Sequence, residues 1–285
     1  MALKSPKGKV VPAQEDTPDE PAGVQAVETG MRVLAALIAL GPTSMLKTIA
    51  EHAGMPPPKA HRYLASFCRG GLVERNPATG GYRLGPLSVQ LGLAALRHLS
   101  VVDVAMPALA ELRDQTGYST GLAIWGNYGP TFVRFEETND VVIISVRAGS
   151  VMPILAAATG RVFGAYMPRA MTEPFIAAEL AGRSSIASAA AVTGTFSHRL
   201  SRAQVEAMFK EVRERGLARV TGDMNKGIHA LAAPVFDHAG ALAGSIALLG
   251  GAGLFDAGFD SANAIALKAK AAEVSRRMGA PPNRA

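Results

Sequence analysis

The stretch from Gly54 to Gly85, GMPPPKAHRYLASFCRGGLVERNPATGGYRLG, limits what the chain can fold into more than any other part of it. Three prolines stand near its start, and a helix tolerates proline only in its first turn. The pattern therefore predicts a helix from about Pro58 to Arg69, which the pair Gly70-Gly71 ends. A shorter helix over 46–53 precedes it. The two helices are joined by a short turn that contains Gly54.

Two short strands follow this helix pair, over 72–75 and 81–84. The residues between them, Asn76-Pro77-Ala78-Thr79-Gly80, are turn formers, so the two strands are expected to pair as a hairpin. Two helices with a short glycine-containing turn, followed by a hairpin, are typical of a winged helix-turn-helix.

The rest of the chain predicts a second, larger domain of the α+β class. Helical apolar spacing favours helices over 24–40, 86–98, 103–116 with Asp103 as N-cap, 157–166, 172–181, 201–215 and 260–278. Strands are expected over 120–126, 131–136, 141–146, 217–220, 228–235 and 242–249. Strands and helices that do not alternate as βαβ units indicate an antiparallel sheet.

These elements predict five parts of the chain. They are a flexible tail over 1–23, a winged helix-turn-helix domain over 24–85, a linker helix over 86–100, the α+β domain over 101–279, and a tail over 280–285. The linker helix has too many apolar residues to stand alone in water. It is expected to pack against a partner, such as the same helix of another subunit.

Charge and composition favour a polyanionic partner for the first domain. Residues 21–100 contain eight Lys and Arg against three acidic residues, which is most of the net charge of +6. The single cysteine, Cys68, excludes an internal disulfide and any multi-cysteine metal site. No cofactor or metal is expected. No apolar run of ~18 residues occurs, so the sequence predicts a soluble, cytoplasmic protein without membrane contact.

Six segments in order resemble the IclR family of transcriptional regulators. They are VETGMRVLAAL (27–37), IAEHAGMPPPKAHRYL (49–64), ERNPATGGYRLG (74–85), GSVMPILAAATGRV (149–162), IHALAAPVFD (228–237) and IALKAKAAEVSRRMG (265–279). The resemblance implies a winged helix-turn-helix, a linker helix and a GAF-like sensor domain. It also implies a homo-dimer or tetramer that binds a palindromic operator in double-stranded DNA and responds to a small organic acid.

The chain departs from the family at two places. Pro57-Pro58-Lys59 stands where small hydroxyl residues usually open the reading helix, and Asp223 stands where the family usually has Glu. The first departure implies that the operator sequence differs as well.

Candidate DNA contacts cluster in the first domain. A helix in the major groove reads base edges, while flanking cations bind phosphates. Arg62 either pairs with guanine or binds phosphate, and His61 either contacts phosphate or packs. Arg32, which matches a family arginine, either contacts phosphate or braces the domain. The full candidate set is Arg32, Lys47, Thr48, Pro58, Lys59, His61, Arg62, Tyr63, Arg75 and Arg83.

The candidate effector site begins at AAATGRV, where backbone amides of Ala158, Thr159 and Gly160 at a helix start suit a carboxylate. Strand ends are expected to form the opposite wall. The remaining candidates are Trp125, Met152, Val220, Ile228, Ala230, Ala247 and Leu249. Trp125 either stacks on an aromatic ligand, as Tyr128 could, or belongs to the core. Apolar walls disfavour a very polar acid, so an aromatic or medium-chain acid is expected.

Two segments of the chain match enzyme motifs only in part. Gly117-Tyr118-Ser119-Thr120-Gly121 has the G-x-S-x-G pattern of serine hydrolases, but a helix precedes Ser119 and a strand follows it, the reverse of what that elbow needs. Residues 251–253 lack the third glycine of a dinucleotide loop. The sequence predicts a regulator and no enzyme. The alternative is a small-molecule-binding or enzymatic domain whose helix-turn-helix contacts protein.

Overall fold

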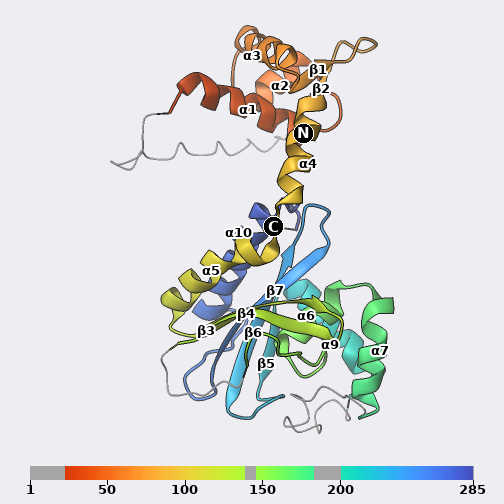
Figure 1. Ribbon diagram of the computed structural model, residues 1–285, viewed down its shortest axis with the longest axis vertical. Helices are drawn as coiled ribbons and strands as arrows, with labels where there is room; N and C mark the ends of the chain where they lie inside the picture. The colour runs from red at the N-terminus through yellow and green to blue at the C-terminus, as the bar shows by residue number, and fades with distance from the viewer. Residues whose placement is uncertain (1–22, 139–145, 183–199, 285) are drawn as a thin grey trace, which may run out of the picture. The chain divides into compact units, whose positions relative to one another are not determined.

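The computed structural model describes residues 23–138, 146–182 and 200–284, and its contacts separate two units, one up to His98 and one from Leu99. The first unit contains, in chain order, α1 (Gln25–Leu40), α2 (Leu46–His52), α3 (Pro57–Arg69), β1 (Val73–Arg75), β2 (Tyr82–Leu84) and α4 (Pro86–Arg97). This order confirms the winged helix-turn-helix (Figure 1). Each element begins or ends within one to two residues of its expected bounds.

The first unit has a small core of its own, built around Val33, Leu37, Ile49 and Leu64, all 2% exposed or less. β1 and β2 pair antiparallel, with Glu74 opposite Arg83. Ser44, just before α2, adds a bridge to Tyr82 of the hairpin. The hairpin is thereby attached to the helix pair, as a wing should be.

The second unit is an antiparallel sheet between two helical layers, which confirms the α+β class. Its elements are α5 (Val101–Thr116), β3 (Ser119–Gly126), β4 (Gly129–Glu136), α6 (Ala158–Tyr166), α7 (Arg169–Leu180), α9 (Arg202–Arg215), β5 (Ala218–Thr221), β6 (Ile228–Phe236), β7 (Leu242–Gly251) and α10 (Ala262–Arg277). The strand order is β4-β3-β7-β6-β5, and every pair is antiparallel. α5 and α10 cover one face, and α6 and α9 cover the other (Figure 1).

Because both faces of this sheet are covered, its central strands are apolar on both sides. In β7, Ile246 and Leu248 face α5 and α10, whereas Ala247 and Leu249 face α6. Successive side chains of a strand point to opposite faces, so a continuous apolar run is the expected pattern here. The residues on the α6 face become the floor of the cavity described below.

Several details differ from expectation. The N-cap of α5 is Ser100, whose Oγ accepts from the backbone N–H of Asp103, so Asp103 lies in the first turn instead of capping it. α7 begins at Arg169, three residues before the expected start at Thr172. Val146 is buried outside any strand, and the rest of the strand expected over 141–146 lies outside the described residues. Of the tail expected over 1–23, residues 1–22 lie outside them as well.

The segment predicted as a tail over 280–285 contains a turn at 282–284, and the guanidinium of Arg284 lies 5.1 Å from the ring centroid of Phe236. In the described part of the chain, no single helix is long and apolar enough to cross a membrane. Only the bent pair of α4 and α5, taken together, reaches that length and composition.

Candidate functional site

α3 carries half of the predicted DNA contacts, five of the ten. α3 begins with Pro57 and Pro58 at its first two positions, where their missing N–H groups cost nothing. Ala60 and Leu64 are fully buried at helical spacing, and this leaves Lys59, His61 and Arg62 exposed on the other side.

A surface groove runs along this face of α3. Of the predicted residues, Pro58, Lys59, His61, Arg62 and Tyr63 line it. Sequence reasoning missed Ser66 and Arg69, which also line it. Their spacing of four and seven residues from Arg62 is the signal that would have found them, because those positions share a helix face.

Arg32 braces the first unit, which is one of the two roles predicted for it. Its Nη2 donates to the carbonyl of Ala53 at 2.5 Å and to that of Gly54 at 3.1 Å. These carbonyls lie at the C-terminal end of α2, where helix geometry leaves acceptors without partners. The contacts fasten α1 to the turn between α2 and α3, as the bracing alternative predicts, while Arg32 stays exposed.

The remaining predicted DNA contacts lie on the wing and on α2. Arg83 pairs with Glu74 at 2.5 Å, and Arg75 donates to the carbonyl of Gly80 at 3.1 Å, so both side chains are engaged within the hairpin. Both stay exposed, as do Lys47 and Thr48 in the first turn of α2. The structure therefore gathers five candidates on α3 and leaves these four on flanking elements.

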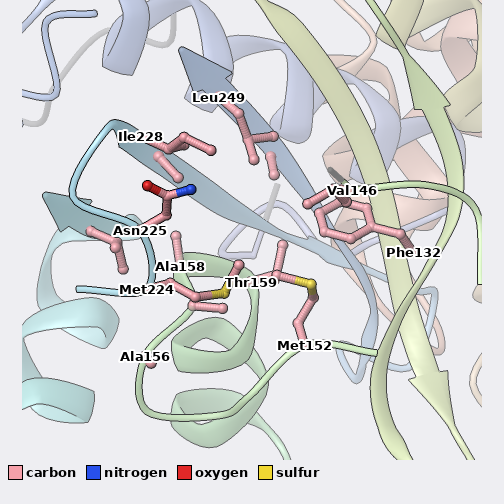
Figure 2. Close-up of a pocket in the computed structure, with 14 residues that line it drawn as sticks. Phe132, Val146, Met152, Ala156, Ala158, Thr159, Met224, Asn225, Ile228 and Leu249 are labelled. Atoms are coloured by element: carbon pink, nitrogen blue, oxygen red, sulfur yellow. The ribbon is translucent and has the colours of Figure 1, made fainter. Parts of the chain in front are cut away.

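A cavity lies in the second unit between the sheet and the start of α6. Figure 2 shows its wall of β-strand residues, with Leu249 and Ile228 facing Ala158 and Thr159 of α6. The predicted residues that line it are Met152, Ala158, Thr159, Val220, Ile228, Ala230, Ala247 and Leu249. Strand ends that are far apart in the sequence thus meet at one helix start, as the sequence predicted.

Two predicted effector residues do not line this cavity. Trp125 packs against Phe163 and Phe175, with ring centroids 5.8 and 5.4 Å apart, and so belongs to the core. Gly160 lies against the backbone of the preceding segment, where a Cβ would overlap the carbonyl oxygen of Pro153. Tyr128 is 74% exposed and also lies outside the lining.

The cavity also contains residues that the sequence did not reveal. They are Phe132, Val146, Ala156, Ala157, Met224 and Asn225. Met224 and Asn225 belong to the turn between β5 and β6, and periodicity does not predict how such a turn folds back over a sheet. Its Gly222 and Gly227, together with Asn225, were the available turn signal.

The lining is almost wholly apolar. Among the described residues that line it, only Thr159 and Asn225 have polar side chains. The Oδ1 of Asn225 accepts from the backbone N–H of Gly227 at 2.9 Å, which sets the orientation of its amide group. The free space within the cavity is about 40 Å³, which is room for roughly three water molecules.

The start of α6 supplies backbone donors to this apolar space. α6 begins at Ala158 after Ala157, and no side chain of the described residues caps it. The first backbone N–H groups of a helix have no partner within the helix, and the helix dipole adds partial positive charge there. The cavity therefore combines apolar walls with a donor-rich, electropositive end.

Two buried charged side chains hold the segment that leads into α6. Both carboxylate oxygens of Glu179, on α7, accept from backbone N–H groups, of Ile154 at 2.5 Å and Leu155 at 2.9 Å. Burial raises the pKa of Glu179 to about 7, and these hydrogen bonds oppose the shift. Arg161, on α6, donates from Nε to the carbonyl of Leu155 at 2.8 Å and pairs with Asp223. Sequence reasoning singled out neither Glu179 nor Arg161.

Comparison with known proteins agrees with both units. The model of the IclR helix-turn-helix domain matches residues 26–77, and that of the bacterial transcriptional regulator IclR C-terminal domain matches residues 93–276. The regulator BhcR of Paracoccus denitrificans is 25% identical over 81% of this chain and 79% of its own. XynR of Escherichia coli is 25% identical over 75% of this chain and 81% of its own.

Among solved structures, Pseudomonas aeruginosa HmgR is 35% identical, with a TM-score of 0.81 over 91% of this chain and all of the other. The two domain models match the first and the second unit in their order along the chain. The chain therefore belongs to the IclR family of DNA-binding transcriptional regulators.

Proposed function

We propose that a small organic acid with an apolar body binds the cavity of the second unit and controls DNA binding by the first. The observation that carries this proposal is the uncapped start of α6 at one end of an apolar cavity. A carboxylate fits the helix start, and a hydrocarbon body fits the walls. The apolar walls favour an aromatic or medium-chain acid over glyoxylate or pyruvate.

The start of α6 is the reason to expect an acid as the ligand. A negative group beside the first turn of a helix gains roughly 0.3–1 kcal/mol, and up to about 2 kcal/mol when partly buried. The apolar walls of the cavity are the reason to expect that the rest of the ligand is apolar. A second polar group placed among Val220, Ile228 and Leu249 would lose its water without gaining a partner, at a cost of roughly 1–3 kcal/mol.

Ligand size is set by two methionines in the lining. A cavity of about 150 Å³ holds benzene, whereas this one has about 40 Å³ of free space. The thioether groups of Met152 and Met224 flank Thr159 in Figure 2. Methionine side chains are flexible and adapt to ligands, so an aromatic acid is expected to enter by displacing them.

Pairing of two chains would place two reading helices on one operator. α4 has no buried residue, and its apolar side chains Leu87, Val89, Leu91, Leu93 and Leu96 are all exposed in the single chain. An apolar helix of this kind favours association with the same helix of a second copy. Two α3 helices related by a two-fold axis would then read a palindrome with half-sites about one DNA turn apart.

A thermal-shift panel tests the effector class. Benzoate, phenylacetate and hexanoate are compared with glyoxylate and pyruvate, and benzamide serves as the neutral match to benzoate. An apolar acid is expected to raise the Tm by about 5 °C at roughly a hundred times its Kd, because only the folded chain binds it. Benzamide should give little shift, because it brings no charge to the helix start.

A matched variant tests the anchor. In Ala158→Pro the first N–H of α6 is lost, while the helix is retained because proline is favoured at its first position. This variant should melt near the wild-type temperature but respond less to benzoate. Stabilisation by glyoxylate or pyruvate alone would contradict the proposed effector class.

A further inference from the structure

Arg161 is a buried cation that forms hydrogen bonds with three separate segments among the described residues of the second unit. Its side chain is 9% exposed, and its Nε donates to the carbonyl of Leu155 at 2.8 Å. Its Nη1 donates to the carbonyl of Arg219 on β5 at 2.5 Å. Its Nη2 donates to Oδ2 of Asp223 in the turn after β5, where the two side chains form an ion pair.

Each of these three segments contributes a wall of the cavity. The segment with Leu155 supplies Met152 and Ala156, and β5 supplies Val220. The turn with Asp223 supplies Met224 and Asn225, which Figure 2 places across the cavity from Met152. Arg161 and Asp223 themselves do not line the cavity. One guanidinium thus connects opposite walls without touching the space between them.

The Arg161–Asp223 ion pair joins the turn over 222–227 to α6. Its backbone hydrogen bonds run within the turn or to the ends of β6 and β7, through Ile228 and Ala252. Among the hydrogen bonds of the described residues, only the one from Arg161 to Asp223 joins this turn to α6. A buried guanidinium without its carboxylate is strongly unfavourable, so the pair resists separation.

We propose that the Arg161–Asp223 ion pair is a positioning device that holds the 222–227 turn against α6 and so sets the opening of the effector cavity. With the pair intact, Met224 and Asn225 stay close to Ala158 and Thr159. Without it, the turn moves away from the helix, the cavity widens, and a bound acid loses one wall. The role in ligand affinity rests on the proposed function, whereas the fastening of the turn does not.

Hydrogen exchange without ligand tests the fastening. In Asp223→Ala, amides of residues 218–230 are expected to exchange at least tenfold faster than in wild type, including those of Gly222 and Ile228, which are hydrogen-bonded in the turn. Amides of β3 serve as the internal reference and should not change. Asp223→Asn keeps the size of the side chain and one acceptor oxygen. Its amides over 218–230 are expected to exchange at rates between those of wild type and Asp223→Ala.

The matched control removes another ion pair of the same unit. Glu173 pairs with Arg202 and Arg169 at a more exposed place, and none of the three lines the cavity. Glu173→Ala should leave exchange over 218–230 unchanged. If Asp223→Ala speeds amide exchange in β3 as much as in the turn, the pair supports the whole domain and the positioning role is wrong. Asp223→Asn must then show the same pattern.

Calorimetric titration with benzoate tests the consequence for binding. Asp223→Ala is expected to weaken benzoate binding about tenfold, and Glu173→Ala is expected to leave it unchanged. If wild type binds no acid while the turn still loosens in Asp223→Ala, the proposed effector class fails and the fastening stands. If benzoate binds wild type and Asp223→Ala equally and exchange is unchanged, the positioning proposal is overturned and the effector class stands.

Discussion

Replacing Arg62 by alanine is expected to lower affinity for a cognate duplex by roughly a hundredfold at fixed salt. The Arg62 side chain is exposed on α3 and forms no hydrogen bond or ion pair with the protein in the part that the structure describes. An arginine that pairs with guanine contributes about 1–3 kcal/mol of discrimination. Two copies on a palindrome would double that free energy, which is why the expected loss is large.

The same substitution should leave the fold intact, because no packing contact of the core is lost. Lys210→Ala is the matched control, since it removes a cation of α9 that is 71% exposed. Lys59→Ala distinguishes base from phosphate contact. If Lys59 contacts phosphate, its loss weakens binding to all duplexes alike and reduces the salt slope by about one. Unchanged affinity in Arg62→Ala, with the melting temperature preserved, would contradict α3 as the reading helix.

Replacing Gly160 by alanine is expected to destabilise the second unit by roughly 3 kcal/mol or more. The added Cβ would overlap the carbonyl oxygen of Pro153 and lie 2.6 Å from the Cα of Ile154. Both obstacles are backbone, and Glu179 and Arg161 hold that backbone in place through Ile154 and Leu155. This backbone segment therefore cannot move to make room for the added Cβ without disturbing these hydrogen bonds.

Thermal unfolding measures this loss, which should lower the Tm by about 6 °C or more. Gly253→Ala is the matched control in the same unit, because nothing lies within 4 Å of a Cβ at Gly253. Its Tm should stay within about a degree of wild type. A Gly160→Ala protein that melts like wild type would mean that the packing of α6 on Pro153 is looser than the structure has it.

The sequence predicted the order and type of the helices and strands well because its strongest signals are local. Prolines and glycines around α3 and the apolar spacing of α1, α9 and α10 depend on a few neighbouring residues. The N-cap of α5 was predicted wrongly because the local sequence offers two candidates. Ser100 and Asp103 are both good capping residues, and only the backbone geometry decides between them.

The cavity was predicted in part. Strand residues such as Val220 and Leu249 were found because the family motifs and strand patterns place them, whereas Met224 and Asn225 depend on how a turn folds over the sheet. Trp125 was ambiguous because an aromatic residue near a cavity and one in the core give the same sequence pattern. Its neighbours Phe163 and Phe175 come from distant helices.

The buried charges were missed because a lone charge on a helix usually marks a solvated position. One signal was present. Arg161 is the only charged residue of α6, and every residue from Ala158 to Ala165 is buried. A cation on a helix with no exposed face must find partners inside the protein, and Leu155, Arg219 and Asp223 provide them.

The central claim is that α3 reads a specific palindrome and that an acid in the second unit changes this reading. The most direct test selects duplexes from a random pool with the full chain and measures anisotropy of the recovered duplex with and without the acid of largest thermal shift. We expect a shared palindrome, bound at least 10³-fold more tightly than a scrambled duplex. Saturating acid should change that affinity by roughly 5- to 150-fold. Equal affinity for recovered and scrambled duplexes, or an acid that leaves specific binding unchanged, would contradict the account.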